Sequence, residues 1–395
     1  MGRIGLNTGE FYRDTWAEID LSCIEENIRS FRHLLPDTTE IMAVVKANGY
    51  GHGAVPVAKT ALEAGATYLA VALLDEAVSL RQQGIKAPIL VLGRTRPEDA
   101  VLAAEYHIAL TVFQASWARE ASDHLQDGQR VALHLKVDTG MGRIGTRDKE
   151  ETQELVLTIE KSPFLQLEGV FTHFATADEL ESPLVKKQFE RFSESLDWLK
   201  EWGTVPRYIH CGNSAASLRF PKQIFNIARI GISMYGLAPS GELKNVLPIP
   251  LKEAFTLNTR LVHVKKVKPG DTISYGATYT AKEEEWIGTL PIGYADGWQR
   301  RYANHGHAIA GGIKVPFAGR ICMDQCMVRL PFEMKVGDLV TLIGEQGSEK
   351  ISMDDVALQN DTINYEIPCL ITSRVPRIYK KQGRILEKVN VILNF

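Results

Sequence analysis

Short runs of apolar residues, separated by segments with a helical pattern, recur along the first part of the chain. Each run is apolar throughout rather than alternating, which is typical of parallel strands covered on both faces. Eight such runs are interpreted as strands: residues 41–47, 68–74, 88–93, 108–113, 131–140, 167–174, 208–213 and 225–234. The pattern therefore predicts a parallel sheet of eight strands.

The segments between the runs are amphipathic. In residues 182–200, apolar side chains recur every three to four residues, and charged side chains occupy the opposite face. The apolar positions are Leu184, Phe189, Phe192, Leu196 and Leu199. Ser182 and Pro183, which precede them, are interpreted as a helix N-cap and a first-turn proline.

Eight alternations of strand and helix predict an α/β fold, a closed (β/α)8 barrel of the TIM type. An open doubly wound sheet is the alternative. No Gly-x-Gly-x-x-Gly motif follows the first strand, which disfavours a dinucleotide-binding version of that open sheet.

The pattern changes at about residue 246. The segment "PIPLKEAF" carries two prolines, and strands separated by turn sequences such as "KPGDT" dominate afterwards. The final segment, "GRILEKVNVILNF", is interpreted as a pair of strands. The sequence therefore predicts a barrel over residues 14–245 and a mostly β domain over residues 246–395.

Composition and charge exclude several classes of protein. The 395 residues are 24% charged and 45% hydrophobic, with a net charge of −3, and no basic stripe suggests a nucleic-acid partner. The five cysteines are scattered and odd in number, which indicates reduced thiols and a cytoplasmic location. No signal-peptide pattern is visible in the first residues and no apolar run of 18 residues occurs, so neither a signal peptide nor a membrane span is expected. No metal-binding motif is present, and the two histidines of "HGH" at 305–307 are interpreted as part of a loop.

Candidate functional residues gather at the C-terminal ends of the predicted strands, where such a barrel carries its active site. They are Lys46, Tyr50, Lys136, Arg143, His173, Asn213, Ser214, Arg229, Gly231 and Ile232. A single strand-end lysine is more often structural, with its stem covering apolar surface. Together, however, these residues describe a site with a reactive amine, a phosphate-compatible helix start and two permanent cations.

The motifs around these residues resemble those of alanine racemases, which use pyridoxal phosphate. The segment "AVVKANGYGHG" resembles the cofactor attachment segment of that family. The resemblance continues in order through "DTGMGRIG", "THFATAD", "NSAA", "RIGISMYG", "SYGATY", "IGYADGW", "CMDQ" and "NYEI", and covers essentially the whole chain. It implies a fold-type III pyridoxal-phosphate enzyme, in which a strand within residues 1–13 joins the C-terminal β domain.

The resemblance implies a role for each matched residue. Lys46 would hold the cofactor covalently and act as one base, and Tyr275 would be the second base on the opposite face of the substrate. Arg143 and Met323 would bind the substrate carboxylate. The implied cofactor-binding residues, besides Lys46, are Tyr50, His173, Asn213, Ser214, Arg229, Gly231, Ile232 and Tyr365. The implied supporting residues are Tyr294, Cys322, Asp324 and Lys136, which is carbamylated in some relatives.

The implied activity is the interconversion of L-alanine and D-alanine, which would supply D-alanine for cell-wall peptidoglycan. The implied active unit is a homodimer with shared sites, in which Tyr275 serves the barrel of the other subunit. Three alternatives remain open: a broader racemase that also accepts serine, a non-catalytic pyridoxal-phosphate-binding barrel, and a barrel-type amino-acid decarboxylase. Binding barrels of this kind lack the β domain, and the decarboxylases favour an acidic residue where Arg229 stands.

Overall fold

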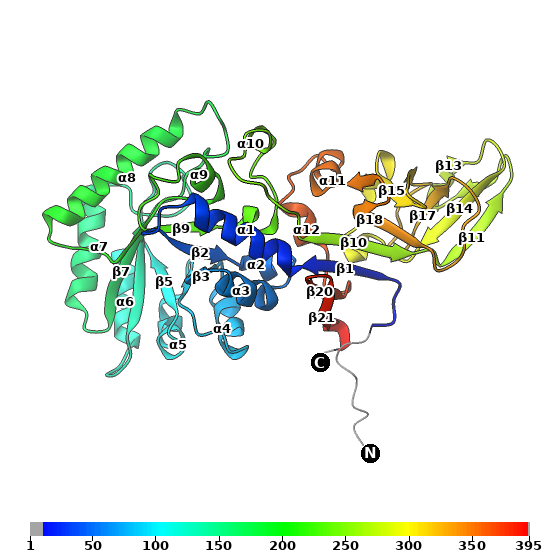
Figure 1. Cartoon of the computed structure of the whole chain (residues 1–395). Coiled ribbons are helices and arrows are strands. Elements are labelled where there is room, and N and C mark those ends of the chain that lie inside the picture. Colours follow the sequence, from blue (N-terminus) through cyan, green and yellow to red (C-terminus); the bar gives the residue numbers. More distant parts are fainter. Residues whose placement is uncertain (1–10, 394–395) are drawn as a thin grey trace, which may run out of the picture. The chain divides into compact units, whose positions relative to one another are not determined.

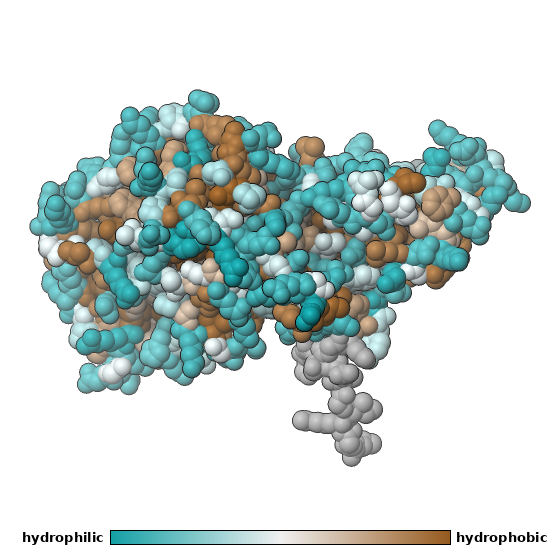
Figure 2. Space-filling model, in the orientation of Figure 1, coloured by the Kyte–Doolittle hydropathy of each residue, from teal (hydrophilic) through white to brown (hydrophobic). Residues whose placement is uncertain are grey.

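The computed structural model describes residues 11–393, which form two compact units. The barrel unit comprises Cys23–Gly49 and Ala54–Lys252. The β unit comprises the N-terminal residues through Ser22, the short segment Tyr50–Gly53, and Glu253–Phe395. On the face that Figure 2 shows, hydrophobic residues form small groups among hydrophilic ones.

The barrel unit contains one sheet of eight parallel strands, which confirms the predicted barrel. The sheet order is β8-β7-β6-β5-β4-β3-β2-β9, so the first strand of the barrel lies beside the last. The strands are β2 (Glu40–Val44), β3 (Tyr68–Val71), β4 (Ile89–Val91), β5 (Ala109–Val112), β6 (Val131–Lys136), β7 (Leu165–Phe171), β8 (Tyr208–His210) and β9 (Ile227–Ile230). Each lies within or beside one of the predicted runs, and most of their residues are buried, as continuous apolar runs require.

Helices surround the outside of this sheet (Figure 1). They are α1 (Leu21–Leu34), α3 (Ala54–Glu63), α4 (Leu74–Gln82), α5 (Ala100–Glu105), α6 (Ala115–His124), α7 (Lys149–Lys161), α8 (Leu184–Glu201), α9 (Ser214–Arg219) and α10 (Gly241–Lys244), with 3-10 turns η1 (Pro97–Asp99) and η2 (Ile232–Tyr235). The short α2 (Lys46–Tyr50) is described with the site.

Helix α8 forms where it was predicted, but two details of that prediction were wrong. Its buried face consists of Val185, Gln188, Phe192, Ser195 and Leu199, so the face is rotated from the apolar positions of the sequence. Gln188 is fully buried because its side chain binds backbone and hydroxyl groups of two strand-end loops. Ser182 does not cap the helix, since its hydroxyl donates to Thr176 Oγ1 at 2.8 Å and Pro183 occupies the cap position.

The β unit is built on an eight-stranded sheet of order β16-β15-β18-β10-β1-β20-β21, with β19 beside β18. Two smaller sheets accompany it, β11-β14-β17 and β12-β13. The strands are β1 (Thr15–Asp20), β10 (Phe255–Arg260), β11 (His263–Val267), β12 (Thr272–Ile273), β13 (Tyr279–Thr280), β14 (Glu285–Leu290), β15 (His307–Ala310), β16 (Ile313–Pro316), β17 (Cys326–Leu330), β18 (Leu339–Gln346), β19 (Glu349–Ile351), β20 (Arg377–Lys381) and β21 (Arg384–Val389). The unit also has α11 (Met353–Gln359), α12 (Glu366–Leu370) and the 3-10 turns η3 (Tyr275–Ala277), η4 (Tyr294–Asp296), η5 (Arg300–Asn304) and η6 (Val391–Leu393).

The first described strand is β1, Thr15–Asp20. The strand predicted within residues 1–13 falls mostly on residues 1–10, which lie outside the described part of the chain, and stays a prediction. Strand β1 pairs antiparallel with β10 and parallel with β20, so both its edges are hydrogen-bonded inside the β unit. The chain enters the barrel unit at Cys23 and leaves it after Lys252, where the sequence placed these boundaries at residues 14 and 245.

The C-terminal segment also differs from the prediction. It holds one strand, β21, which pairs with β20, and then the turn η6 instead of a second strand. The register of the β20–β21 pair shifts between Tyr379 and Lys380, which is a bulge in this ladder.

Candidate active site

Lys46 stands at the carboxyl end of the first barrel strand. The N–H of Val45 still donates to Ala70 O of the neighbouring strand at 2.8 Å, and the chain turns immediately afterwards. Ala47, Asn48 and Gly49 all have left-handed backbone angles, with φ of 52°, 51° and 62°. Residues other than glycine rarely adopt this backbone conformation, and such backbone strain concentrates at functional sites. The turn leaves Lys46 half-buried at the strand end.

A carboxylate stabilises this turn from the next loop of the barrel. Glu76 accepts the N–H of Ala47 at 2.5 Å and the N–H groups of Ala72 and Leu73 at 2.8 and 3.2 Å. One side chain therefore ties the loop after β2 to the loop after β3. The sequence analysis missed Glu76, which no motif singles out.

Arg229, on β9, is buried within the barrel unit, with 3% of its surface exposed. Its Nη1 lies 2.8 Å from His210 Nδ1, and its Nη2 lies 3.3 Å from His173 Nδ1. Backbone oxygens of Thr172, His210 and Cys211 accept its other bonds. Burial lowers the pKa of Arg229 to about 10, so the guanidinium stays charged at neutral pH and can only donate.

His173 follows β7, where the sequence placed it at a strand end. Burial, followed by the charges of Arg229, Lys136, Arg143 and Lys46, holds the pKa of His173 well below its ordinary value. The imidazole is therefore neutral at pH 7, and its Nδ1 can accept from Arg229. The four cations that the sequence predicted in the barrel unit therefore all act electrostatically on His173.

Two short helical turns begin side by side at the ends of β8 and β9. Asn213 caps α9 by accepting the Ala216 N–H at 2.9 Å, and Ser214 is the first residue of that helix. The N–H of Gly231, immediately before η2, donates to Ser214 Oγ at 2.9 Å. The hydroxyl keeps its own proton as a donor, and first-turn N–H groups such as that of Ile232 have no acceptor within their own helix. This arrangement places several donors together, as an anion-binding site requires.

The loop after β6 carries Arg143. Asp138 accepts the N–H groups of Gly140 and Gly142 at 3.1 and 2.9 Å, which folds the loop back, and the Thr146 N–H closes it on Lys136 O at 2.9 Å. Arg143 is exposed within this loop.

Lys136 is buried beneath the loop, with its Nζ 3.2 Å from Val137 O and 5.1 Å from the Phe171 ring centre. Burial, with help from the charge of Arg229, lowers the pKa of Lys136 to about 7. A large share of this amine is therefore uncharged at neutral pH.

The β unit presents Tyr275 to solvent, with 72% of its surface exposed. The residue before it, Ser274, has φ of 69°, and its hydroxyl donates to Arg320 O at 2.7 Å. A side chain on Gly319 would clash with Ser274, since an added Cβ would lie 2.6 Å from that residue's Cβ. The strained, tightly packed Ser274 holds η3, and with it Tyr275, on the surface of the unit.

The segments containing Tyr294 and Met323 pair with each other beside Tyr275. The N–H of Tyr294 donates to Cys322 O, and the N–H of Ala295 donates to Met323 O, both at 3.0 Å. Cys322 Sγ lies 3.6 Å from the hydroxyl of Ser274, which links this pair to the Tyr275 turn. Met323 is 53% exposed. The structure thus brings the implied β-unit residues Tyr275, Tyr294, Cys322, Met323 and Asp324 into one region.

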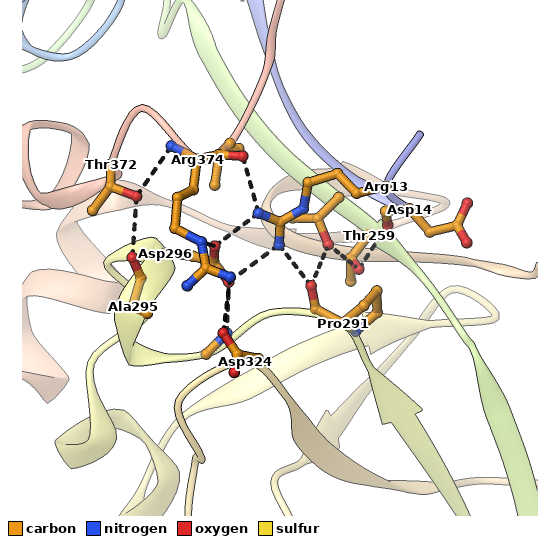
Figure 3. A network of polar contacts seen from close by, with 12 residues as sticks. Arg13, Asp14, Thr259, Pro291, Ala295, Asp296, Asp324, Thr372 and Arg374 are labelled. Carbon is orange, nitrogen blue, oxygen red and sulfur yellow. Dashed lines mark hydrogen bonds and ion pairs between the residues drawn. The ribbon is translucent and has the colours of Figure 1, made fainter. Parts of the chain in front are cut away.

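The buried carboxylate of Asp296 stabilises this region through hydrogen bonds (Figure 3). Asp296, fully buried at the end of η4, accepts two bonds from Arg13 at 2.7 and 3.1 Å and the Gly293 N–H at 3.0 Å. Arg374 Nε lies 3.5 Å from Asp296, and its Nη2 donates to Asp324 at 2.8 Å. Arg13 and Asp296 were not identified from the sequence, because nothing local marks residues so far apart as partners.

Tyr50 and Tyr365 meet inside the β unit, with ring centres 6.4 Å apart. An added Cβ on Gly51 would lie 2.0 Å from Pro368 O, so only glycine allows the segment to approach α12 this closely. Burial raises the pKa of Tyr50, which keeps its hydroxyl protonated as a donor. The cofactor-binding residues implied by the resemblance are therefore divided between the two units.

Comparison with known proteins decides the family. The model of the alanine racemase N-terminal domain matches residues 19–239, and that of the C-terminal domain matches residues 254–379. This chain belongs to the alanine racemase family.

Relatives of known name agree along the whole length. The chain is 60% identical to an alanine racemase of Geobacillus stearothermophilus, over 97% of this chain and 98% of that protein. It matches the crystal structure of alanine racemase from Bacillus anthracis with bound L-Ala-P at a TM-score of 0.95 and 51% identity, covering 98% and 100% of the two chains. A histidine racemase from Leuconostoc mesenteroides matches at a TM-score of 0.87 and 31% identity, over 95% and 100%.

The alanine racemase family consists of isomerases that depend on pyridoxal phosphate, and the described residues fit that cofactor. Lys46 supplies an amine at a strand end, and the donors around Ser214 and Gly231 suit a phosphate. Arg229 lies among imidazoles and carbonyls, with no carboxylate among its hydrogen-bond partners in residues 11–393. No helix among these residues is both long and apolar enough to cross a membrane.

Proposed function

We propose that this alanine racemase-family protein interconverts L-alanine and D-alanine with pyridoxal phosphate as its cofactor. The observation that carries the proposal is the surroundings of Arg229. A buried guanidinium that binds only neutral acceptors offers hydrogen bonds and cannot give up its proton at neutral pH. Bound to Lys46, the cofactor supplies a ring that accepts the charge left when the substrate's Cα proton departs.

In this proposal Lys46 holds the cofactor and then moves the proton on one face of the substrate. Ser214, Gly231 and Ile232 hold the phosphate, with Asn213 fixing the start of α9. Tyr50 and Tyr365, which belong to the β unit, are the other cofactor-binding residues of this proposal.

Arg229 acts by not protonating the cofactor ring. When the cofactor is bound, Arg229 would donate to its ring nitrogen without protonating it, and this would make the ring a weaker acceptor of charge. A shorter-lived charge on Cα favours return of the proton over transfer of the amino group. His173 lies beside Arg229 and orients it. An acidic residue at this position would favour a decarboxylase, the alternative that the sequence left open.

Racemisation needs a second base, because one lysine cannot easily reach both faces of a planar carbon. We assign this role to Tyr275, which the β unit exposes together with Met323. Arg143 and the backbone N–H of Met323 bind the substrate carboxylate, and Tyr294, Cys322 and Asp324 support that loop. The active unit is a homodimer, the commonest oligomer, in which Tyr275 serves the partner's barrel.

The cysteines are scattered along the chain and odd in number, which supports a reducing, cytoplasmic location. There the product D-alanine would feed peptidoglycan synthesis. Because a neighbour of the same fold is a histidine racemase, the fold alone does not choose the substrate. Incubation with each L-amino acid, followed by separation of the enantiomers, is expected to give D-alanine fastest. Faster conversion of serine or of a larger amino acid would overturn the choice of alanine.

Attachment at Lys46 is tested by borohydride reduction of the purified protein and peptide mapping. The cofactor is expected on the peptide that contains Lys46, and Lys46→Arg is expected to abolish that labelling. Label on another lysine would overturn the assignment. Lys59, on α3, serves as the matched control, and Lys59→Arg should keep the label.

Sharing of sites is tested with mixed dimers. Lys46→Ala and Tyr275→Phe homodimers are each expected to be nearly inactive. In a heterodimer one site carries both defects and the other is intact, so about half of the wild-type activity should return. Inactive heterodimers, with wild-type dimers surviving the same exchange, would show that Tyr275 acts within its own subunit or is not the second base.

A further inference from the structure

A chain of hydrogen bonds runs from Arg229 through the barrel to a carboxylate that the proposed mechanism does not use. Arg229 Nη1 lies 2.8 Å from His210 Nδ1, His210 Nε2 lies 2.9 Å from His134 Nδ1, and His134 Nε2 lies 3.2 Å from Glu168 Oε2. The four residues come from strands β9, β8, β6 and β7. Both imidazoles are fully buried, while the Glu168 side chain is 23% exposed.

The residues at the two ends of this series of hydrogen bonds, Arg229 and Glu168, determine which atom donates in every bond between them. The guanidinium of Arg229 can only donate, so His210 Nδ1 must accept. An ionised Glu168 can only accept, so His134 Nε2 must donate. If both rings are neutral, His210 carries its proton on Nε2 and donates it to His134 Nδ1. Every link is then satisfied, and each ring has a single tautomer.

The surroundings favour these protonation states. Burial lowers the pKa of His134, and burial with the charge of Arg229 holds that of His210 well below its ordinary value. Hydrogen bonds from His134 and Tyr68, together with the positive charge of Arg207, outweigh burial and lower the pKa of Glu168. The Tyr68 hydroxyl donates to the same Glu168 oxygen at 3.1 Å. Neutral rings and an ionised carboxylate therefore coexist at pH 7.

The backbone is shaped to admit His134. The register of β6 on β7 shifts between Leu133 and His134, and His134 then pairs with Gly169. An added Cβ on Gly169 would lie 2.5 Å from His134 Nδ1, so the ring needs a glycine at this position. Tyr208 stacks on the His134 ring at 5.9 Å, and Phe171 stacks on the His210 ring at 4.6 Å. Packing thus locks both rings, which is what a relay of fixed direction requires.

We propose that Glu168 is a positioning residue for the racemase. Through its hydrogen bond to His134 it sets the tautomers of His134 and His210, so that His210 offers an unprotonated Nδ1 to Arg229. The role of Arg229 in catalysis rests on the function proposed above, whereas the direction of the chain does not. Without the carboxylate, His134 can accept from Tyr68, whose hydroxyl lies 3.5 Å from its Nε2. The hydrogen bonds would then reverse their direction: His134 Nδ1 would donate to His210 Nε2, and the proton on His210 Nδ1 would face the N–H of Arg229.

The direction is tested on the full chain labelled with ¹⁵N-histidine, with and without pyridoxal phosphate. Protonated and unprotonated ring nitrogens have well-separated ¹⁵N shifts, and His134→Gln and His210→Gln assign the signals. At pH 7 both rings are expected to be neutral and protonated on Nε2. A proton on Nδ1 of either ring, or a charged imidazolium, would overturn the proposal without any variant of Glu168.

The role of Glu168 is tested with Glu168→Gln, which keeps the shape of the side chain but lets it donate as well as accept. The Nδ1-protonated form of His134 and His210 is expected to appear, while Tyr68→Phe, which leaves the carboxylate in place, should change neither ring. Unchanged tautomers in Glu168→Gln would overturn the role.

Kinetics on the cofactor-loaded protein separate the relay from the function. Glu168→Gln should lower kcat by about 10-fold with little change in KM, and should lower the ratio of racemisation to transamination. Altered tautomers with unchanged kcat and ratio would overturn the effect on Arg229. A wild-type protein with the expected tautomers but no racemase activity would refute the proposed function and leave the relay standing.

Discussion

Replacing Asp296 by asparagine should destabilise the β unit far more than its small change in shape suggests. Asp296 is fully buried and accepts three hydrogen bonds, two of them from the Arg13 guanidinium. Asparagine removes the charge and turns one acceptor into a donor, so Arg13 loses a partner. Breaking a buried ion pair from one side costs about 3–5 kcal/mol. Because the Arg13 side chain is 24% exposed and can regain water, the expected loss is about 2–3 kcal/mol.

Asp324→Asn is the matched control, since Asp324 also accepts from Arg374 but its side chain is 58% exposed. An exposed pair of this kind contributes about 0–1 kcal/mol. Calorimetric and urea-induced unfolding of the full chain would compare the two variants, following the transition of the β unit. Equal stability of Asp296→Asn and Asp324→Asn would refute the reasoning that burial makes Asp296 important.

Three further predictions follow from the barrel unit. Arg229→Glu should lower racemisation and raise transamination relative to it, measured as D-alanine against pyruvate; an unchanged ratio would contradict the role given to Arg229. Since the pKa of Lys136 is lowered to about 7, its uncharged amine should react with carbon dioxide near neutral pH, and mass spectrometry or a bicarbonate dependence of activity that Lys136→Arg removes would show it. The folded pKa values of His134, His173 and His210 are all lowered, so below pH 6.5 the unfolded chain binds protons that the folded chain does not. Stability present above that pH should therefore fall with acidification, by up to about 1.4 kcal/mol per histidine for each pH unit, and His210→Gln should reduce the slope measured by urea unfolding.

The sequence determined the plan of the barrel and the position of its reactive ends. Eight apolar runs became eight parallel strands, because a strand covered on both faces must be apolar throughout. The same pattern placed Lys46 and Arg229 at neighbouring strands, since β2 pairs with β9 in the closed sheet. The glycines after Lys46 indicated a tight turn, but only the structure showed that Ala47 and Asn48 also adopt its left-handed backbone conformation.

Tertiary structure decided what local patterns do not encode. Hydrophobicity alone places Gln188 on the solvent-facing side of α8. The buried face is rotated because Gln188 forms hydrogen bonds with the strand-end loops and is buried with them. Strand β1 joins the β unit through pairing with β10 and β20, more than 200 residues away in sequence. His134 and His210 are separated by 76 residues, and Arg13 and Asp296 by 283. These pairs form only when the strand register of the folded sheets brings the two residues together. The pair of His134 and His210 also needs the register shift at His134 and the absence of a Cβ at Gly169.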